Sequence, residues 1–119
     1  MRAAFAHEAL LTMEPDADSG APGAAITVEL CGHWNHEPPC PLAPHHTRVE
    51  QIEGGVRLRI LFAAEANNES SVREGITRAL ADGRLDEPGG VTTRWTLRDS
   101  RPGEVLASEF EHAQELINH

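Results

Sequence analysis

The segment 48–62 most limits what this chain can fold into. Apolar side chains recur at every second position along its second half, as Val56, Leu58, Ile60 and Phe62. Because successive side chains of a strand point to opposite faces, this pattern predicts a strand over 56–62 with one buried face. Gly54 and Gly55 precede it, and glycine readily adopts the positive φ that tight turns need. The segment therefore predicts a β-hairpin with arms 48–52 and 56–62.

Weaker patterns predict three more strands. Ile26, Val28 and Leu30 alternate with less apolar residues, which predicts a half-buried strand over 26–30. Residues 9–13 predict a short first strand, and the turn-rich stretch 14–23 predicts an exposed loop after it. A strand is also expected over 91–98, followed by a turn at 101–103. Its inner face is expected to hold Thr93, Trp95 and Leu97.

Two segments have the apolar spacing of amphipathic helices. The helix 68–83 has an asparagine at its start, Asn67 or Asn68, and Gly83 at its end. Its apolar stripe consists of Val72, Ile76, Ala79 and Leu80. The helix 105–118 is expected to have an inner face of Leu106, Phe110, Ala113 and Leu116 or Ile117.

This order of elements predicts an α+β two-layer sandwich. A mostly antiparallel sheet would carry two helices packed on one face, in a ferredoxin-like or related arrangement, and its other face would be wet. The 119 residues suit a single domain, 1–119, with an inserted Cys/His-rich loop at 31–46.

The charge balance argues against a nucleic-acid partner. Ten basic residues, all arginine, and nineteen acidic residues give a formal net charge of −9, which repels phosphate backbones. No apolar run approaches the roughly 18–20 residues needed to span a bilayer. The first eleven residues do not read as a secretory signal. We therefore expect a cytoplasmic protein that binds neither nucleic acid nor a membrane.

Six potential metal ligands lie close together in the sequence. They are Cys31, His33, His36, Cys40, His45 and His46. The whole chain holds two cysteines and seven histidines, so this grouping is far denser than chance placement would give. Thiolate and imidazole are the ligands that zinc and other borderline metals prefer. The sequence therefore predicts a site for zinc, or for another transition metal.

The expected site has two thiolates and two imidazoles. A strand that continued to His33 would place it on the same face as Cys31. The next strand would return one of the two histidines at 45 and 46 beside Cys31. Cys40 could fold over from the loop tip, and His36 could replace His33. Two other interpretations stay open: a loop held by local hydrogen bonds or a Cys31–Cys40 disulfide, and a redox-active or nucleophilic thiol.

Two catalytic motifs that this region matches in part are excluded. The run from His36 to Cys40 imitates the HExxH motif of zinc proteases, but consecutive prolines cannot stand inside the helical turn which that motif needs. The zinc-deaminase signature requires a second cysteine where this chain has Ala43. No GxGxxG, P-loop or GxSxG pattern is present.

These residues predict a small metal-binding protein. The metal would pin the proline-rich Cys/His loop, and this loop or the exposed sheet face would contact a protein partner. The same ligands also fit a metal-dependent enzyme with an open site, in which Glu37 acts as general base. A third interpretation is a metal chaperone or accessory subunit that passes its ion to a larger enzyme.

The remaining charged residues give weaker expectations. Arginines on the outer faces of strands could form a basic patch, made of Arg57, Arg59, Arg94 and Arg98. Alternatively, they pair across strands with glutamates, namely Glu29, Glu50 and Glu53. The other histidines are expected to be isolated and exposed: His7, His112 and His119.

Overall fold

The computed structural model describes residues 2–31, 43–87 and 89–118, except for the side chain of Cys31. Its strands are β1 (Arg2–Thr12), β2 (His45–Ile52), β3 (Gly55–Glu65), β4 (Arg84–Asp86), β5 (Thr92–Arg94) and β6 (Thr96–Gly103). Its α-helices are α1 (Ala21–Cys31), α2 (Glu69–Asp82) and α3 (Phe110–Ile117). The short 3₁₀ turns η1 (Ala66–Asn68) and η2 (Ala107–Glu109) precede α2 and α3. The predicted mixed α+β class is confirmed.

Four strands form one antiparallel sheet in the order β2-β3-β1-β6, and β4 pairs with β5 in a small second sheet. The predicted hairpin is confirmed, since β2 pairs with β3 from His45 opposite Phe62 to Ile52 opposite Gly55. Gly54 takes a φ of 81° in the turn. A Cβ on Gly55 would lie 1.9 Å from the carbonyl oxygen of Leu11, so β1 passes too close for any side chain there.

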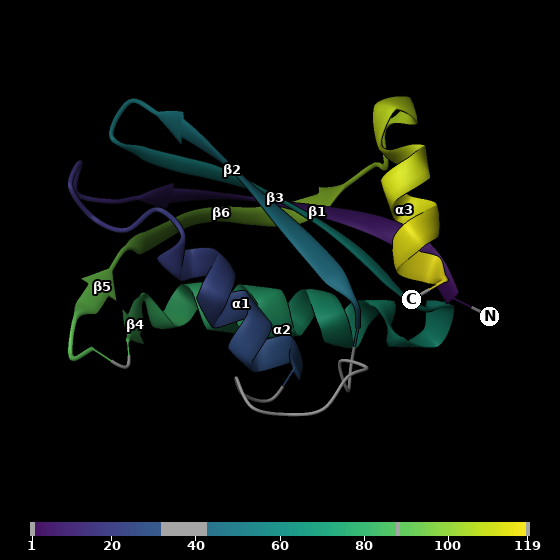
Figure 1. Ribbon diagram of the computed structural model, residues 1–119, viewed down its shortest axis with the longest axis horizontal. Coiled ribbons are helices and arrows are strands. Elements are labelled where there is room, and N and C mark those ends of the chain that lie inside the picture. Colours follow the sequence, from purple (N-terminus) through teal and green to yellow (C-terminus); the bar gives the residue numbers. More distant parts are fainter. Residues whose placement is uncertain (1, 32–42, 88, 119) are drawn as a thin grey trace.

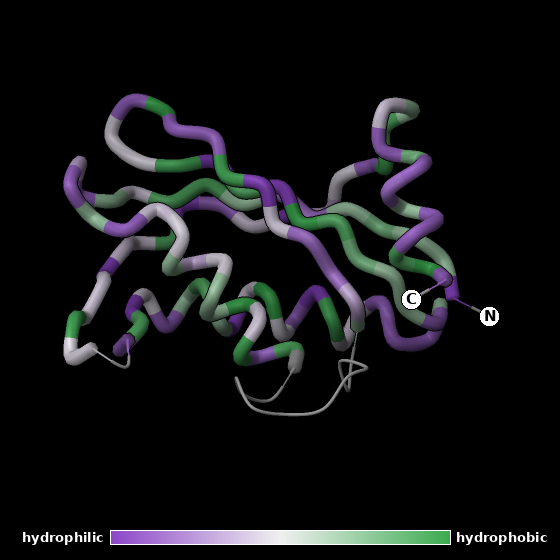
Figure 2. The backbone as a smooth tube through the Cα atoms, in the orientation of Figure 1, coloured by the Kyte–Doolittle hydropathy of each residue, from purple (hydrophilic) through white to green (hydrophobic). Residues whose placement is uncertain are grey.

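Helices α1 and α2 cover one face of the sheet (Figure 1). The predicted stripe of α2 is buried against the alternating apolar side chains of β3. Trp95 joins this core and donates from its indole nitrogen to the Leu80 carbonyl at 2.8 Å. Gly83 ends α2 with a φ of 72°. Figure 2 shows hydrophobic residues recurring along the strands and along the helix beneath them, as expected for one shared core.

The strand predicted over 26–30 is wrong, because these residues belong to α1. The buried hydrophobic positions of this helix are Ala21, Ala25, Ile26 and Leu30. Their spacing is helical, and Val28, which a strand would have buried, is only half-buried. Pro22 stands in the first turn, where its missing N–H is not needed. The predicted loop 14–23 is therefore shorter, and the predicted strand 9–13 overlaps the end of the much longer β1.

The strand predicted over 91–98 is two strands that separate at Trp95. β5 pairs with β4, whereas β6 pairs with β1 in the main sheet. The turn predicted at 101–103 is wrong, because these residues continue β6 beside β1.

Helix α3 packs on the sheet face opposite α1 and α2 (Figure 1). Its Ala113 is buried against Ala6 and Leu61 in a second, smaller core. Two residues predicted on its inner face are instead largely exposed, Leu106 at 49% and Phe110 at 58%. The face predicted to be wet is thus partly covered, by a helix with little buried apolar surface.

Candidate functional site

The six predicted metal ligands differ in where they lie and in how much of each the structure describes. His33, His36 and Cys40 lie outside the described residues. Cys31 is the last residue of α1, and only its backbone is described. His45 and His46 are the first two residues of β2. Within 2–31, 43–87 and 89–118, no three His, Cys, Asp or Glu side chains are grouped so that they could hold a metal ion.

The expected geometry around Cys31 needs correction. Cys31 ends a helix and not a strand, so the alternation of a strand does not relate it to His33. A helical turn instead relates Cys31 to Thr27, four residues earlier. The Thr27 hydroxyl oxygen lies 3.1 Å from Nε2 of His45. Cys31 therefore stands one turn beyond a direct contact between α1 and the start of β2.

The surroundings of His45 favour the neutral form of its imidazole. Its Nδ1 lies 3.1 Å from the Ala43 carbonyl oxygen, which can only accept, so Nδ1 carries the hydrogen. Burial lowers the pKa of His45, although the bond to Ala43 acts in the opposite direction. Nε2 of the neutral ring then carries the lone pair and faces the Thr27 hydroxyl, whose single hydrogen is shared between Nε2 and the Gly23 carbonyl at 3.2 Å. A histidine that ligates a metal typically has this form, with its other ring nitrogen bonded to a carbonyl.

His46 has different surroundings from His45. Its ring lies 4.7 Å from the ring of His112 on α3, measured between centroids. Neighbouring residues of a strand project to opposite faces, so β2 directs one histidine toward α1 and the other toward α3. The rings of the two adjacent histidines therefore have different neighbours. It gives a ring partner to His112, which the sequence predicts to be isolated.

A hollow of about 350 Å³ opens beside His45, between α1 and the edge strand β2. Its lining includes Gly23 and Thr27 of α1 and both His46 and Thr47 of β2. The Thr47 hydroxyl oxygen is buried and has no hydrogen-bond partner in the described part of the chain. A buried hydroxyl without a partner costs about 1–3 kcal/mol. The hollow therefore borders an unused polar group as well as His45.

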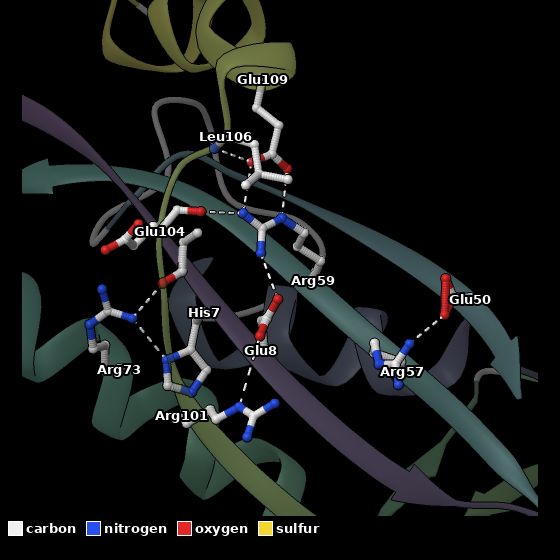
Figure 3. A network of polar contacts seen from close by, with 11 residues as sticks. His7, Glu8, Glu50, Arg57, Arg59, Arg73, Arg101, Glu104, Leu106 and Glu109 are labelled. Carbon is white, nitrogen blue, oxygen red and sulfur yellow. Dashed lines mark hydrogen bonds and ion pairs between the residues drawn. The ribbon is translucent and has the colours of Figure 1, made fainter.

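A buried polar chain begins at His7, which the sequence predicts to be exposed. That prediction is wrong, since His7 is only 3% exposed. Its Nδ1 lies 3.0 Å from Nη1 of Arg73, and its Nε2 lies 2.8 Å from the Ser100 hydroxyl. The Ser100 hydroxyl lies 2.7 Å from that of Thr77. Figure 3 shows Arg73 reaching His7 from α2, and this pairing has no local signal in the sequence.

The direction of these bonds decides what His7 can do. A guanidinium only donates, so Nδ1 accepts from Arg73 and Nε2 donates its hydrogen to Ser100. A serine nucleophile needs the reverse, a bare nitrogen facing its hydroxyl. Burial, assisted by the charge of Arg73, lowers the pKa of His7 to about 4. The chain is therefore a structural element and not a nucleophile with its base.

Arg59 forms a second network on the outer face of the sheet (Figure 3). It donates from Nη1 to Glu8 at 2.7 Å, from Nε to Glu109 at 2.7 Å, and from Nη2 to the Glu104 carbonyl. Hydrogen bonds from Arg59 lower the pKa of Glu109 to about 2. Arg59 is 9% exposed, so it is not part of an exposed basic patch.

The predicted four-arginine patch does not form on one sheet. Arg94 belongs to β5 of the small sheet. Arg57 pairs with Glu50 across β2 and β3 at 2.7 Å, which is the alternative expected from the sequence. Arg98 donates from Nε to the Thr12 hydroxyl.

Comparison with known proteins assigns no family to this chain. Among the helices described, none has the length and apolar character to cross a bilayer. No protein-family model, curated protein or solved structure matches the chain.

Proposed function

We propose that this protein binds zinc, or another borderline transition metal, with two thiolates and two imidazoles. The proposed ligands are Cys31, Cys40, His45 and either His33 or His36. The observation that carries the proposal is the contact between Thr27 and His45, which joins the start of β2 to α1 one turn before Cys31, the last residue of the helix. The chain between these two points contains the other proposed ligands.

The state of His45 supports its role as a ligand. A metal binds only neutral imidazole, and the lowered pKa of His45 favours that form. The bond from Nδ1 to the Ala43 carbonyl orients the ring and leaves Nε2 as the ligating atom. His46 is left out of the proposed set because its ring packs against His112.

We further propose that the metal ties the segment 32–44 to the edge of the sheet, where the segment forms a surface for a protein partner. The strand order β2-β3-β1-β6, with α1 and α2 as connections, supports a ferredoxin-like arrangement as the framework. The net charge of −9 disfavours nucleic acid as the partner.

Metal analysis of protein purified without a histidine tag tests this proposal. We expect about one zinc per chain, as in a closed structural site. Cobalt substitution should add a thiolate charge-transfer band in the near ultraviolet. A folded protein with less than about a tenth of a metal per chain contradicts the proposal.

Single substitutions test the ligand assignment. Cys31→Ser, Cys40→Ser and His45→Gln should each lose most of the metal, whereas His46→Gln should retain it. His46 is the matched control, because it is the next residue of the same strand. The core between the sheet and α1 and α2 is built from apolar side chains of the strands and helices and contains neither His45 nor His46, so far-ultraviolet circular dichroism should change little. Equal metal loss in His45→Gln and His46→Gln would contradict the assignment of His45, and not His46, as the ligand from β2.

The hollow beside His45 favours a second candidate function, a metal-dependent enzyme with an open coordination position. An open site has three protein ligands and leaves a place for water or substrate. Azide should then change the visible spectrum of the cobalt-substituted protein. A spectrum that stays constant at saturating azide supports the closed, structural site instead.

A further inference from the structure

We propose that the outer face of the sheet binds a single phosphate group in a cleft between the start of β2 and the start of α3. The cleft has a volume of about 160 Å³. Its polar lining residues are His46, Arg48, Arg59, Ser108, Glu109 and His112. They come from β2, β3, η2 and α3, so the fold and not one local segment assembles the cleft.

Arg48 is the guanidinium of the cleft that forms no close ion pair with a described residue. Arg48 stands directly opposite Arg59 in the register of β2 and β3, and like charges in opposite positions destabilise a strand pair. Arg59 is paired with both Glu8 and Glu109. The charge of Arg48 acts on the Glu109 carboxylate and helps to lower its pKa, but no carboxylate of the described residues lies within 4.0 Å of Arg48. An anion in the cleft would give Arg48 the close ion pair that it lacks.

The hydrogen-bonding groups of the cleft also favour an anion. The Glu109 carboxylate already accepts from Arg59 and from the backbone N–H of Leu106 at 2.9 Å. The groups that remain are the Arg48 guanidinium, the Ser108 hydroxyl and the two imidazoles, each of which can donate. A metal ion between the paired rings of His46 and His112 would meet two guanidiniums in the same cleft. Repulsion by these cations disfavours it.

The size of the cleft limits the ligand. Sites for drug-sized molecules have volumes of roughly 300–1,000 Å³, so this cleft suits one phosphate group and not a whole nucleotide. Guanidinium groups form strong, charge-assisted hydrogen bonds to phosphate oxygens. The phosphate cleft is separate from the proposed zinc site, because Cys31 is the last residue of α1 and the ring of His45 contacts Thr27 of α1.

Titration of the full-length protein with inorganic phosphate, followed by NMR, tests the site. We expect saturable shifts at the Ser108 amide and in the His112 ring. Arg48→Gln should weaken phosphate binding about tenfold, as expected for the loss of one charge-assisted contact. Arg57→Gln is the matched control and should bind as the original chain does. Arg57 lies on β3, two residues from Arg59, but pairs with Glu50 and does not line the cleft.

Ser108→Ala is a second variant, for use if Arg48→Gln alters the fold, and it should also weaken binding. The inference is overturned if phosphate gives no saturation up to about 20 mM, which is weaker than millimolar affinity. It is equally overturned if Arg57→Gln weakens binding as much as Arg48→Gln, or if acetate binds as well as phosphate. Shifts of the His46 and His112 rings with zinc but not with phosphate would reassign the cleft to a metal.

Discussion

Single buried residues couple the stability of this protein to pH, and His7 is the clearest case. Its pKa is lowered from 6.5 to about 4 in the folded chain, chiefly by burial. The unfolded chain therefore binds more protons in this range, and stability should fall as the pH drops from 6.5 toward 4. The whole shift of the His7 pKa, from 6.5 to about 4, corresponds to about 3 kcal/mol in the free energy of unfolding. Urea unfolding of the original chain and of His7→Gln at several pH values measures this effect.

His7→Gln should show a flatter dependence, because glutamine can keep the bonds to Arg73 and Ser100 without titrating, and the slope that remains is expected from His45, whose pKa is also lowered by burial. Thr77→Val is the control, since it removes the last hydroxyl of the chain but retains the imidazole. The measurements should stay above pH 4.5, because Glu109, with its pKa lowered from 4.5 to about 2, loses its own stabilising effect below that. An equal pH dependence in His7→Gln and the original chain would show that another group is responsible.

At the scale of elements, the β2–β3 hairpin depends on the close approach of β1. Gly55→Ala should lower the free energy of unfolding by about 2–3 kcal/mol, because its Cβ would meet the Leu11 carbonyl oxygen and β1 would have to shift. Gly54→Asn is the matched control. Its φ of 81° suits asparagine, and no atom lies within 4 Å of an added Cβ. Thermal or urea unfolding compares the two, and similar losses would contradict the role assigned to the Leu11 contact.

At the scale of the whole molecule, Arg59 holds α3 against the sheet. This side chain joins β3 to Glu8 of β1, to the Glu104 carbonyl after β6 and to Glu109 before α3. The apolar contact of α3 is small, so Arg59→Met should cost about 3 kcal/mol and release α3 first. Hydrogen exchange should show faster exchange in α3 than in α2. Arg57→Met is the control and should cost less than about 1 kcal/mol, because its pair with Glu50 is exposed.

The hairpin and α2 could be predicted from the sequence, because the residue pattern of each fits only one kind of secondary structure. The hairpin combines strict alternation with a Gly-Gly turn, and α2 has a helical stripe with Gly83 at its end. The segment of α1 was ambiguous, because Ile26 and Leu30 fit both periods. Packing against α2 and the sheet decides in favour of the helix. The interruption at Trp95 between β5 and β6 also depends on tertiary structure, because the two strands pair in different sheets.

The sequence by itself determined the chemical types present: a group of Cys and His residues between 31 and 46, a net negative charge with ten arginines and no lysine, and an α+β class. These follow from composition and local spacing. Only the tertiary structure decided which groups meet. It turned His45 and His46 toward different helices, buried His7 against Arg73, 66 residues away, and placed Arg59 among three carbonyl or carboxylate partners. Contacts between such distant residues depend on how the sheet and helices pack, and no local periodicity encodes that packing.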